Sequence, residues 1–463
     1  MIGTALLGIC AYTLLLFSIV TPTQLERTVR GLRAVPNDFV QESNTKKEFI
    51  TAGDEKIIVD TIAAVDGLRF EFNRQQQETP VGWMEWLSAP LSLARDALPV
   101  SSARKYPSCG LSEADKMRYT SLKRGGRIFI AINLLDNEEL MPTLTRELLA
   151  LLRELGPDRF FVSIYENGSM DLTVMQLRLL CKILDTIGTP YRVVARGMME
   201  LQQKENGHRI SRLSLARNIA MEPLIMAQNS TSSSSSESFE TLLFLNDVFH
   251  CHGDVLELLL QKRRNQAVQA CGLDSGPRAL IYDRWVLRTM RGGPFYRQKD
   301  LIDFFAPPDD DMDSKPRPQI LPEVEDTQDR HAYEAGNPFQ VFSCWNGVTA
   351  FSADAFAPPT SLRFRTAHND PDSKDGVTDK ASECYLSSVD LWKAGLGRII
   401  VVPRTRVGYS LDVYEADRAS STYGPASGSP PLIGWSTTPP GKVVMHDFAQ
   451  WYAPETEEPW DEA

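Results

Sequence analysis

Residues 241–247 read TLLFLND, five strand-forming or apolar residues followed at once by an amide and a carboxylate. A short, nearly continuous apolar run of this kind is typical of a strand buried on both faces. Residues 255–270 carry apolar side chains at helical spacing and are predicted to form the next helix. Asn246 and Asp247 therefore stand at the carboxyl end of a buried strand, where open α/β sheets bind their ligands.

The same alternation of strand and helix extends upstream. Strands are predicted at 128–132, 159–165 and 191–194, and helices at 140–155, 174–187 and 209–227. This alternation indicates a parallel sheet with helical crossovers, so the fold class is α/β. Polar residues also end two of these strands: Asn133 follows the first, and Tyr165 and Glu166 end the second. We expect these strand ends and Asn246 to meet in one crevice.

Asp247 is the predicted metal ligand. Mg²⁺ and Mn²⁺ prefer oxygen ligands and commonly take only one or two protein carboxylates, with phosphate and water completing the shell. Asn246 or Asp254 could assist Asp247. The alternative is that Asp247 caps the following turn or helix, as aspartates at strand ends often do. His250 and His252 are close in sequence but lack a convincing third ligand, which argues against zinc.

A basic helix is predicted just before this strand. Arg209 and Arg212 share one helical face, with Arg217 near it, and Asn218 belongs to the same helix. Guanidinium groups suit bidentate phosphate contact, so the helix could present cations to a nucleotide. The alternative is a solvated basic face. No G-x-G-x-x-G follows a strand, and no P-loop or G-x-S-x-G elbow occurs, which argues against dinucleotide, ATPase and α/β-hydrolase functions.

Composition narrows the function further. The net charge of −11, from 60 acidic and 49 basic residues, argues against nucleic acid as a partner. The 463 residues suffice for one large core or two smaller ones. Six cysteines follow residue 100 and could pair completely, although the sequence leaves their connectivity open. They are Cys109, Cys181, Cys251, Cys271, Cys344 and Cys384.

The N-terminus predicts a membrane anchor. Residues 2–24 carry no charge and are mostly apolar, about the ~20 residues that a bilayer-crossing helix needs. A cleaved signal peptide would have a shorter apolar region and a small-residue cleavage site. Arg27, Arg30 and Arg33 follow the span, whereas an anchor with a lumenal body usually has its positive charge before it.

The chain is predicted to divide into four segments. The anchor is 1–24, a stem and N-terminal packing region is 25–125, the main domain is 126–414, and an acidic tail with Pro, Gly and Ser clusters is 415–463. Two low-complexity insertions are expected in the main domain. One is rich in Ser near 228–238, and the other is rich in Pro and Asp at 306–337.

Seven blocks of the sequence, in order, carry a resemblance to a known family. They are FVSIYENGSMD from Phe161, RISRLSLARNIAMEPL from Arg209, LLFLNDVFHCHGDVLELL from Leu242, ACGLD from Ala270, YDRWVLR from Tyr282, FQVFSCWNGVTAF from Phe339, and SECYLSSVDLWKAGLGRIIVVPRTRVGY from Ser382. Together they resemble the fungal α-1,3-mannosyltransferase family typified by the cryptococcal capsule-associated mannosyltransferases. The resemblance covers roughly residues 127 to 409 outside the insertions.

This resemblance implies a single-pass membrane protein of the Golgi or endoplasmic reticulum with a lumenal catalytic domain. It implies an A-type glycosyltransferase fold, an open mixed sheet flanked by helices. It further implies transfer of mannose from GDP-mannose to a glycan acceptor, with retention and an α-1,3 linkage, assisted by Mn²⁺ (or Mg²⁺). The pair Asn246-Asp247 resembles the short acidic metal motif of such folds, although its first position is Asn rather than Asp.

The resemblance also suggests roles for other residues. Asp283, Glu383 and Asp390 are the catalytic candidates, because a carboxylate near the sugar can activate an acceptor or stabilise a developing positive charge. Trp345 and Asn346 are candidates for acceptor binding. The nucleotide-sugar candidates are Asn133, Tyr165, Glu166, Arg209, Arg217, Asn218 and Asn246, and the metal candidates are Asp247 and Asp254. The competing interpretations are a cap or an ion pair for each carboxylate, and core packing for Trp345.

Two other functions stay open on sequence grounds. A catalytically inactive relative could bind glycans or assist polysaccharide export, since a fold does not certify turnover. A glycoside hydrolase would use two carboxylates and need no nucleotide. Loss of nucleotide-sugar turnover on Asp247→Ala would separate the enzyme from the binding protein, and activity without a nucleotide would reveal the hydrolase.

Overall fold

The computed structural model describes most of the chain after residue 108. The described residues are 39–43, 109–169, 171, 173–195, 209–229, 238–276, 280–305, 318, 327–367, 381–420, 423, 430–445 and 455–461. The predicted anchor and most of the predicted stem lie outside them, as do 230–237 and most of 306–326. Within the described ranges, no helix has the length and apolar character needed to span a bilayer.

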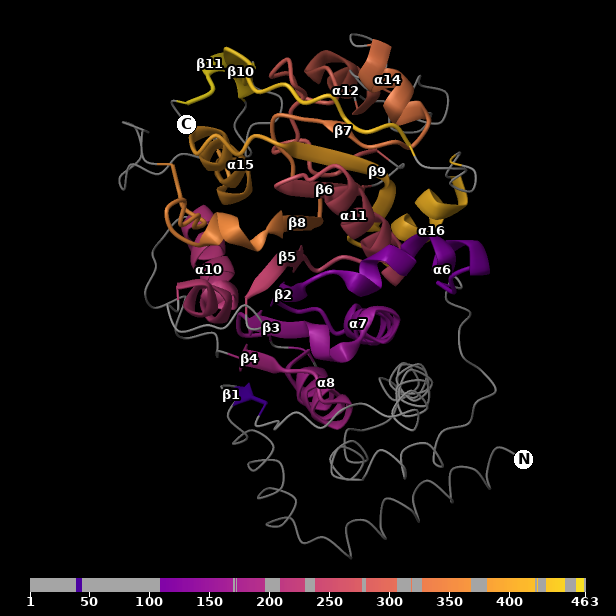
Figure 1. Ribbon diagram of the computed structural model, residues 1–463. Coiled ribbons are helices and arrows are strands. Elements are labelled where there is room, and N and C mark those ends of the chain that lie inside the picture. The colour runs from indigo at the N-terminus through magenta and orange to yellow at the C-terminus, as the bar shows by residue number, and fades with distance from the viewer. Residues whose placement is uncertain are drawn as a thin grey trace, which may run out of the picture.

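A nine-stranded sheet forms the centre of the described protein, in the order β1-β4-β3-β2-β5-β8-β6-β9-β7 (Figure 1). Strands β4, β3, β2 and β5 run parallel, as the alternation predicted, and β8 runs antiparallel to both β5 and β6. The sheet is therefore open and mixed. Its strands are β1 Phe39–Glu42, β2 Arg127–Leu134, β3 Phe160–Glu166, β4 Tyr191–Ala195, β5 Phe239–Leu245, β6 Gln269–Ser275, β7 Phe339–Gln340, β8 Val348–Ser352 and β9 Ile399–Gly408.

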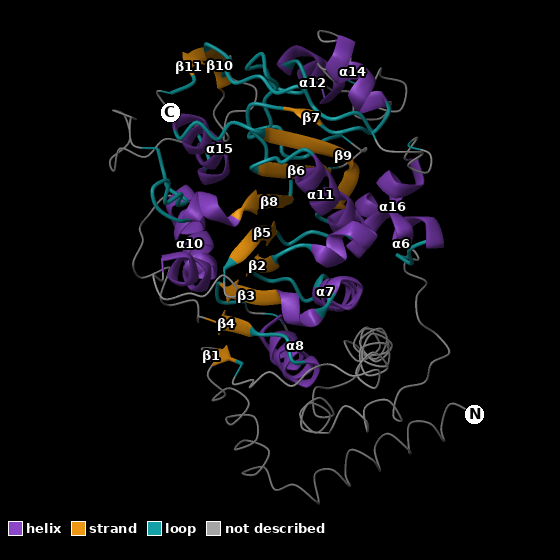
Figure 2. Cartoon of the chain, in the orientation of Figure 1, coloured by secondary structure: helices purple, strands orange, loops and turns teal. Residues whose placement is uncertain are grey.

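Helices cover both faces of the sheet (Figure 2). Helices α10 and α15 lie on one face, and α7, α8 and α11 lie on the other. Alternate residues of β2 enter the two cores, Phe129 on the α10 side and Ile130 on the α7 side, because successive side chains of a strand point to opposite faces. The helices are α6 Glu113–Tyr119, α7 Met141–Leu155, α8 Thr173–Ile187, α10 Arg209–Asn229, α11 His252–Arg264, α12 Gln298–Phe305, α14 Thr327–Glu334, α15 Glu383–Lys393 and α16 Leu411–Ser420.

Helix α11 shows why the element boundaries differ from those expected. It starts at His252, three residues before the expected start, because the Asp254 carboxylate accepts a hydrogen bond from Cys251 N at 3.0 Å and caps the first turn. It ends at Arg264, because Gln266 adopts the left-handed region with φ of 53°. The expected helix at 255–270 therefore ran too long, and its last residues belong to β6.

The segments expected to be loop or tail contain ordered elements. Helix α14 begins at Thr327, inside the expected insertion at 306–337. In the tail, strands β10 (Lys442–Met445) and β11 (Thr456–Pro459) pair antiparallel. The buried Arg288 donates from Nε to the Val444 carbonyl at 2.7 Å, so this pair is packed onto the main body.

Four of the six cysteines form disulfides, Cys109–Cys251 and Cys271–Cys344. Cys181 and Cys384 are buried and unpaired, so complete pairing, which the cysteine count allowed, does not occur. The reason is geometric: Cys181 packs in the core on the α8 side of the sheet, and Cys384 packs in the core on the opposite side.

Candidate active site

A buried cluster of hydrogen bonds forms where β5 ends. Arg217 of α10 donates from Nε to Glu383 Oε1 at 2.9 Å and from Nη1 to Asn246 Oδ1 at 3.1 Å. Arg217 is 7% exposed and Glu383 is 2% exposed, so this ion pair is almost inaccessible to solvent. Because leaving either charge unpaired there is costly, the pair fixes α10, α15 and the β5 end relative to one another.

Aromatic rings form a wall around this cluster. Trp345 donates from Nε1 to Asn246 Oδ1 at 3.2 Å, and the Arg217 guanidinium lies 4.3 Å from the centre of a Trp345 ring. Phe244 and Phe364 flank the same guanidinium at 5.0 and 5.8 Å. Trp345 is 2% exposed, so its ring belongs to the wall of the cluster and offers no open face to solvent.

A second network links the Asp274 carboxylate to the backbone of Asp283 through Asn346, while the Asp283 carboxylate accepts a hydrogen bond from Val286 N at 3.2 Å. Asn346 donates from Nδ2 to Asp274 Oδ1 at 2.8 Å and to the Asp283 carbonyl at 3.3 Å, and Asp283 N donates to Asp274 Oδ1 at 3.1 Å. Asn346 holds a left-handed backbone with φ of 53°, and the Gly347 carbonyl accepts from Asn246 N at 2.9 Å. The strained turn therefore connects the carboxyl pair to the β5 end.

The two carboxyl groups differ in exposure and titration. Burial and then the neighbouring Asp274 charge raise the pKa of Asp283 to about 7. Burial also raises the pKa of Asp274, whose buried Oδ2 has no hydrogen-bond partner within the described ranges. Asp283 is only half-buried. A carboxyl group with a pKa close to neutral can exchange a proton with a reacting hydroxyl near neutral pH.

Two tyrosines lie next to this cluster. Asn246 donates from Nδ2 to the Tyr409 hydroxyl at 3.3 Å. The Tyr282 ring lies 4.7 Å from the Tyr409 ring, centre to centre, and Tyr282 is 54% exposed. Tyr282 thus supplies the open aromatic surface at this site that the buried Trp345 does not.

Asp247 lies in a bend after β5 and is half-buried. Among the residues that the structure describes, the one hydrogen bond to its side chain comes from Asn137 Nδ2, at 3.5 Å from Oδ2. It does not cap α11, because Asp254 does so and also accepts from the Tyr414 hydroxyl at 2.8 Å. The Asp247 carboxylate is therefore available to a ligand, whereas the Asp254 carboxylate is engaged within the fold.

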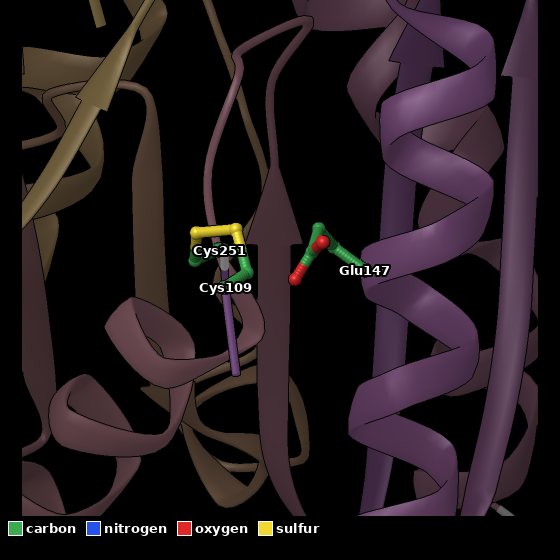
Figure 3. A group of neighbouring side chains, drawn as sticks. All are labelled: Cys109, Glu147 and Cys251. Carbon is green, nitrogen blue, oxygen red and sulfur yellow. A yellow bond between two sulfur atoms is a disulfide. The ribbon is translucent and has the colours of Figure 1, made fainter. Parts of the chain in front are cut away.

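Another group of sulfur and carboxylate atoms is not a metal site. In the described part of the chain, Cys109, Glu147 and Cys251 form the one cluster of three such ligands. The two sulfur atoms are bonded to each other (Figure 3). Glu147 Oε2 accepts from His252 N at 2.9 Å and lies 2.7 Å from His252 Nδ1. The group therefore braces the start of α11, just beyond Asp247.

Comparison with known proteins identifies the family. The family model described as "Cryptococcal mannosyltransferase 1" matches residues 127–390, more than half of the chain. The chain belongs to this family. It is also 32% identical over 381 residues to a protein of Cryptococcus neoformans named Alpha-1,3-mannosyltransferase CMT1, covering 79% of this chain and 78% of that protein. The resemblance noted from the sequence blocks is thereby confirmed, and the chain is a glycosyltransferase by family.

Solved structures show weaker likeness than the family comparison. The mannosyltransferase PcManGT from Pyrobaculum calidifontis, in complex with GDP-Man and Mn²⁺, has a TM-score of 0.33 and 10% identity over 77% of this chain and 67% of that one. S. aureus TarS 1-349 has a TM-score of 0.32 and 10% identity over 61% of this chain and 60% of that one. These TM-scores are too low to support an argument about this chain.

Within this member of the cryptococcal mannosyltransferase 1 family, the sheet register brings Asn133 beside the β5 end. Ile132 pairs with Leu245, so Asn133 follows at the same edge as Asn246. Asn133 donates from Nδ2 to the Ala216 carbonyl at 2.9 Å, and its buried Oδ1 has no donor in the part of the chain that the structure describes. An unsatisfied buried acceptor next to the cluster is suited to a donor group on a ligand.

Four other nucleotide candidates occupy different positions. Tyr165 is buried in the core beneath α10. Glu166 is fully buried and accepts from Ser169 N, which orders the loop after β3. Arg209 is exposed at the first position of α10, about 12 Å along the helix from Arg217. Asn218 bonds the Phe364 backbone through both amide atoms, at 2.8 and 3.1 Å, and so supports the aromatic wall.

Asp390 lies apart from the other two catalytic candidates. Its carboxylate forms a two-point ion pair with Arg365, at 2.8 Å for each contact. The arrangement matches the alternative of an ion pair that the sequence left open. The structure therefore gathers Asp283 and Glu383 around the β5 end and gives Asp390 a separate partner.

Three residues of this site were absent from the sequence-based candidates: Asp274, Tyr282 and Tyr409. Asp274 lies at the end of the apolar run 270–273, the same pattern that pointed to Asp247, so this signal was present in the sequence. Tyr282 and Tyr409 lie in loops, and no periodicity marks their proximity. Only the pairing of β6 with β9 brings these tyrosines together.

Proposed function

We propose that this family member transfers mannose from GDP-mannose to a glycan acceptor, forming an α-1,3 linkage with retention and using Mn²⁺ or Mg²⁺. The observation that carries the proposal is the Asp247 carboxylate at the end of β5, beside the buried Arg217–Asn246–Glu383 cluster. Within the described ranges, this carboxylate caps no helix and forms no ion pair. The name of the Cryptococcus neoformans relative supports the donor sugar and the linkage.

Asp247 fits a hard divalent cation by its chemistry. A single carboxylate at a strand end, with a ligand diphosphate and water, satisfies the usual Mg²⁺ or Mn²⁺ shell. Bound there, the cation would neutralise the negative charge of the departing nucleoside diphosphate. Asn246 and Asn133 lie at the same strand edge and can orient the donor through their amide groups.

Glu383 and Asp283 take separate tasks in the proposed reaction. Glu383 Oε1 is held by Arg217, while Oε2 is buried, has no partner among the described residues, and can accept a hydrogen bond from a donor-sugar hydroxyl. The acceptor oxygen approaches the anomeric carbon on the face from which the diphosphate departs. Its bond to that carbon forms as the bond from the carbon to the diphosphate oxygen breaks, so the anomeric configuration is retained. The acceptor proton passes to the Asp283 carboxylate, and the diphosphate leaves with the bonding electrons.

The exposed Tyr282 ring is proposed as a stacking surface for the acceptor or for the nucleobase. Its partner Tyr409 is tied to Asn246, so a ligand on Tyr282 would lie beside the cluster. We also propose a lumenal catalytic domain in the Golgi or endoplasmic reticulum, anchored through residues 2–24. Two disulfides support an oxidising compartment.

The test is Asp247→Ala in the purified full chain, with release of GDP from GDP-mannose measured in Mn²⁺. We expect at least a 100-fold loss of turnover and loss of Mn²⁺-dependent GDP binding. Asp158→Ala is the matched control, because Asp158 is exposed at the amino-terminal end of β3, far from the β5 end. Unchanged turnover in Asp247→Ala would contradict the proposal. A wild-type protein that binds glycans but turns over no donor would favour the inactive, glycan-binding alternative.

A further inference from the structure

A cavity of about 700 Å³ lies at the amino-terminal end of β5, whereas Asp247 follows the carboxyl end of this strand. Its lining includes the first residues of β2 and β5, the last turn of α11, the last residue of β8 and the residue before β9. Strand β5 runs from this cavity to Asn246, about 20 Å at the usual rise per residue. The cavity is therefore separate from the proposed active site, and its volume is within the range of small-ligand pockets.

The cavity concentrates positive charge. Five of its described lining residues are Lys or Arg, and two are carboxylates, Glu240 and Asp354. The whole chain, in contrast, has a net charge of −11. A local excess of cations in a concave surface attracts anionic ligands.

Lys262 is the most informative residue of the lining. It is 6% exposed, and its Nζ approaches the hydroxyls of Thr241 at 3.4 Å and Ser352 at 3.3 Å. Among the described residues, no carboxylate lies within ion-pair distance of Nζ. Burial lowers the pKa of Lys262 to about 8, although the more distant Glu240 and Asp354 raise it in part. A buried ammonium without a counter-ion is costly, and a ligand anion would supply that counter-ion.

The helix dipole does not account for Lys262. The last turn of α11 also carries Arg263 and Arg264, which bond the carbonyls of Ser121 and Pro430 at 2.9 and 2.8 Å. These two exposed or half-buried arginines already place cations at the helix C-terminus, where they are favourable. A cation can interact with the C-terminal end of a helix without being buried. Lys262, in contrast, extends inward between the start of β5 and the end of β8.

Other lining groups define the ligand further. Arg398 is exposed just before β9, and in the described part of the chain its side chain has no recorded partner. Arg159 donates from its two terminal nitrogens to backbone carbonyls, and its buried Nε has no acceptor among the described residues. The Asp354 carboxylate likewise has no recorded partner among the described residues and can accept hydrogen bonds from hydroxyl groups. A ligand with an oxyanion at one end and hydroxyls at the other would satisfy all of these groups.

We propose that this cavity binds a small phosphorylated sugar, with its phosphate on Lys262 and Arg398 and its hydroxyl groups toward Asp354. The site stands independently of the proposed transfer reaction, since it shares no residue with the cluster around Asp247.

The test is calorimetric titration of the full chain carrying Asp247→Ala, without metal, using mannose 1-phosphate, inorganic phosphate and mannose as probes. We expect saturable 1:1 binding of mannose 1-phosphate, weaker binding of inorganic phosphate, and no measurable binding of mannose. Lys262→Met should weaken the binding of mannose 1-phosphate at least tenfold. Lys182→Met, an exposed lysine of α8, is the matched control and should leave it unchanged.

Arg398→Ala keeps the test decisive if Lys262→Met fails to fold, because Arg398 is exposed and its removal leaves no buried group unpaired. It too should weaken binding. The proposal would be overturned if mannose 1-phosphate showed no saturable binding at millimolar concentration. It would also be overturned if mannose 1-phosphate bound both variants as tightly as the unsubstituted cavity, or if mannose bound as tightly as mannose 1-phosphate.

Discussion

At the residue scale, Asp283 gives the proposed reaction its pH dependence. Its raised pKa of about 7 means that the carboxyl is mostly protonated below neutral pH and cannot then accept a proton. If it accepts the proton of the acceptor hydroxyl, kcat/KM should rise about tenfold per pH unit below 7 and level off above it. Asp283→Asn should abolish this limb and lower turnover at least 100-fold.

The control for this profile is Asp158→Asn, which changes an exposed carboxylate away from the β5 end. It should retain both the rate and the pH limb of the wild type. A pH limb that persists in Asp283→Asn would assign the titration to another group and remove Asp283 from the reaction.

Lys262 carries a stability cost that can be measured. Its pKa falls from 10.5 to about 8 on folding, so the folded state disfavours the charged amine. The resulting penalty is fully present below pH 8 and disappears as pH rises through 10.5. Lys262→Met should therefore raise the free energy of unfolding at pH 7 by up to about 3 kcal/mol, and this advantage should shrink between pH 8 and 10.5.

Urea denaturation across that pH range measures the effect. Lys182→Met should stay within about 0.5 kcal/mol of the wild type at every pH, as for most exposed positions. A Lys262→Met variant less stable than the wild type at pH 7 would show that the amine supports the fold. A gain in stability would instead match a residue kept for binding at the expense of the fold.

At the element scale, the two disulfides hold different parts of the proposed site. Cys271–Cys344 links β6 to the residue just before Trp345 and Asn346. Cys109–Cys251 fixes the N-cap of α11, four residues after Asp247 (Figure 3). The Cys271–Cys344 disulfide therefore restrains the Asn346 turn next to Asp274 and Asp283. The Cys109–Cys251 disulfide restrains the segment that follows Asp247.

Replacing each cysteine pair by serine should lower the free energy of unfolding by about 2–4 kcal/mol. The cost should be about 0.6 kcal/mol greater for Cys109–Cys251, because it closes 142 residues rather than 73 and the loop entropy grows with loop length. We expect the Cys271→Ser/Cys344→Ser protein to lose the larger share of turnover at a temperature where both variants are folded. Chemical denaturation measures the stability of each variant, and GDP release measures its turnover. Equal turnover in both variants would show that the Asn346 turn does not contribute to the reaction.

At the scale of the whole molecule, the C-terminal strands complete the body. Arg288 is fully buried and loses the Val444 acceptor if β10 is removed, and Trp460 packs against Phe342 with ring centres 6.2 Å apart. A chain ending after residue 441 should unfold at a clearly lower temperature, because a buried guanidinium is left with an unmet donor at a cost of about 1–3 kcal/mol.

The matched control ends after residue 461 and retains β11 and Trp460. Its melting temperature, measured by circular dichroism, should equal that of the full chain. Equal melting temperatures for both truncations would show that β10 and β11 lie on the surface without stabilising the protein.

Local sequence was sufficient to predict the part of the fold in which strands and helices alternate, from β2 to β5. The apolar runs that became β2, β3, β4 and β5 are short and buried, and α7 and α8 repeat apolar residues at helical spacing, so a window of ten to fifteen residues contains the signal for these elements. The parallel order of these strands then put Asn133, Asn246 and Asp247 at one edge of the sheet. That edge is where the proposed site lies.

Contacts between distant segments were decided only by the folded chain. The antiparallel insertion of β8 between β5 and β6 brings Asn346 to Asp274, 72 positions away, and α15 brings Glu383 to Arg217, 166 positions away. No local pattern encodes such pairings, because they depend on which buried polar groups satisfy one another once the cores close. For the same reason, sequence gave Asp390 and Glu383 equal weight, and only the packed structure gave one an Arg365 partner and the other a place beside Asn246.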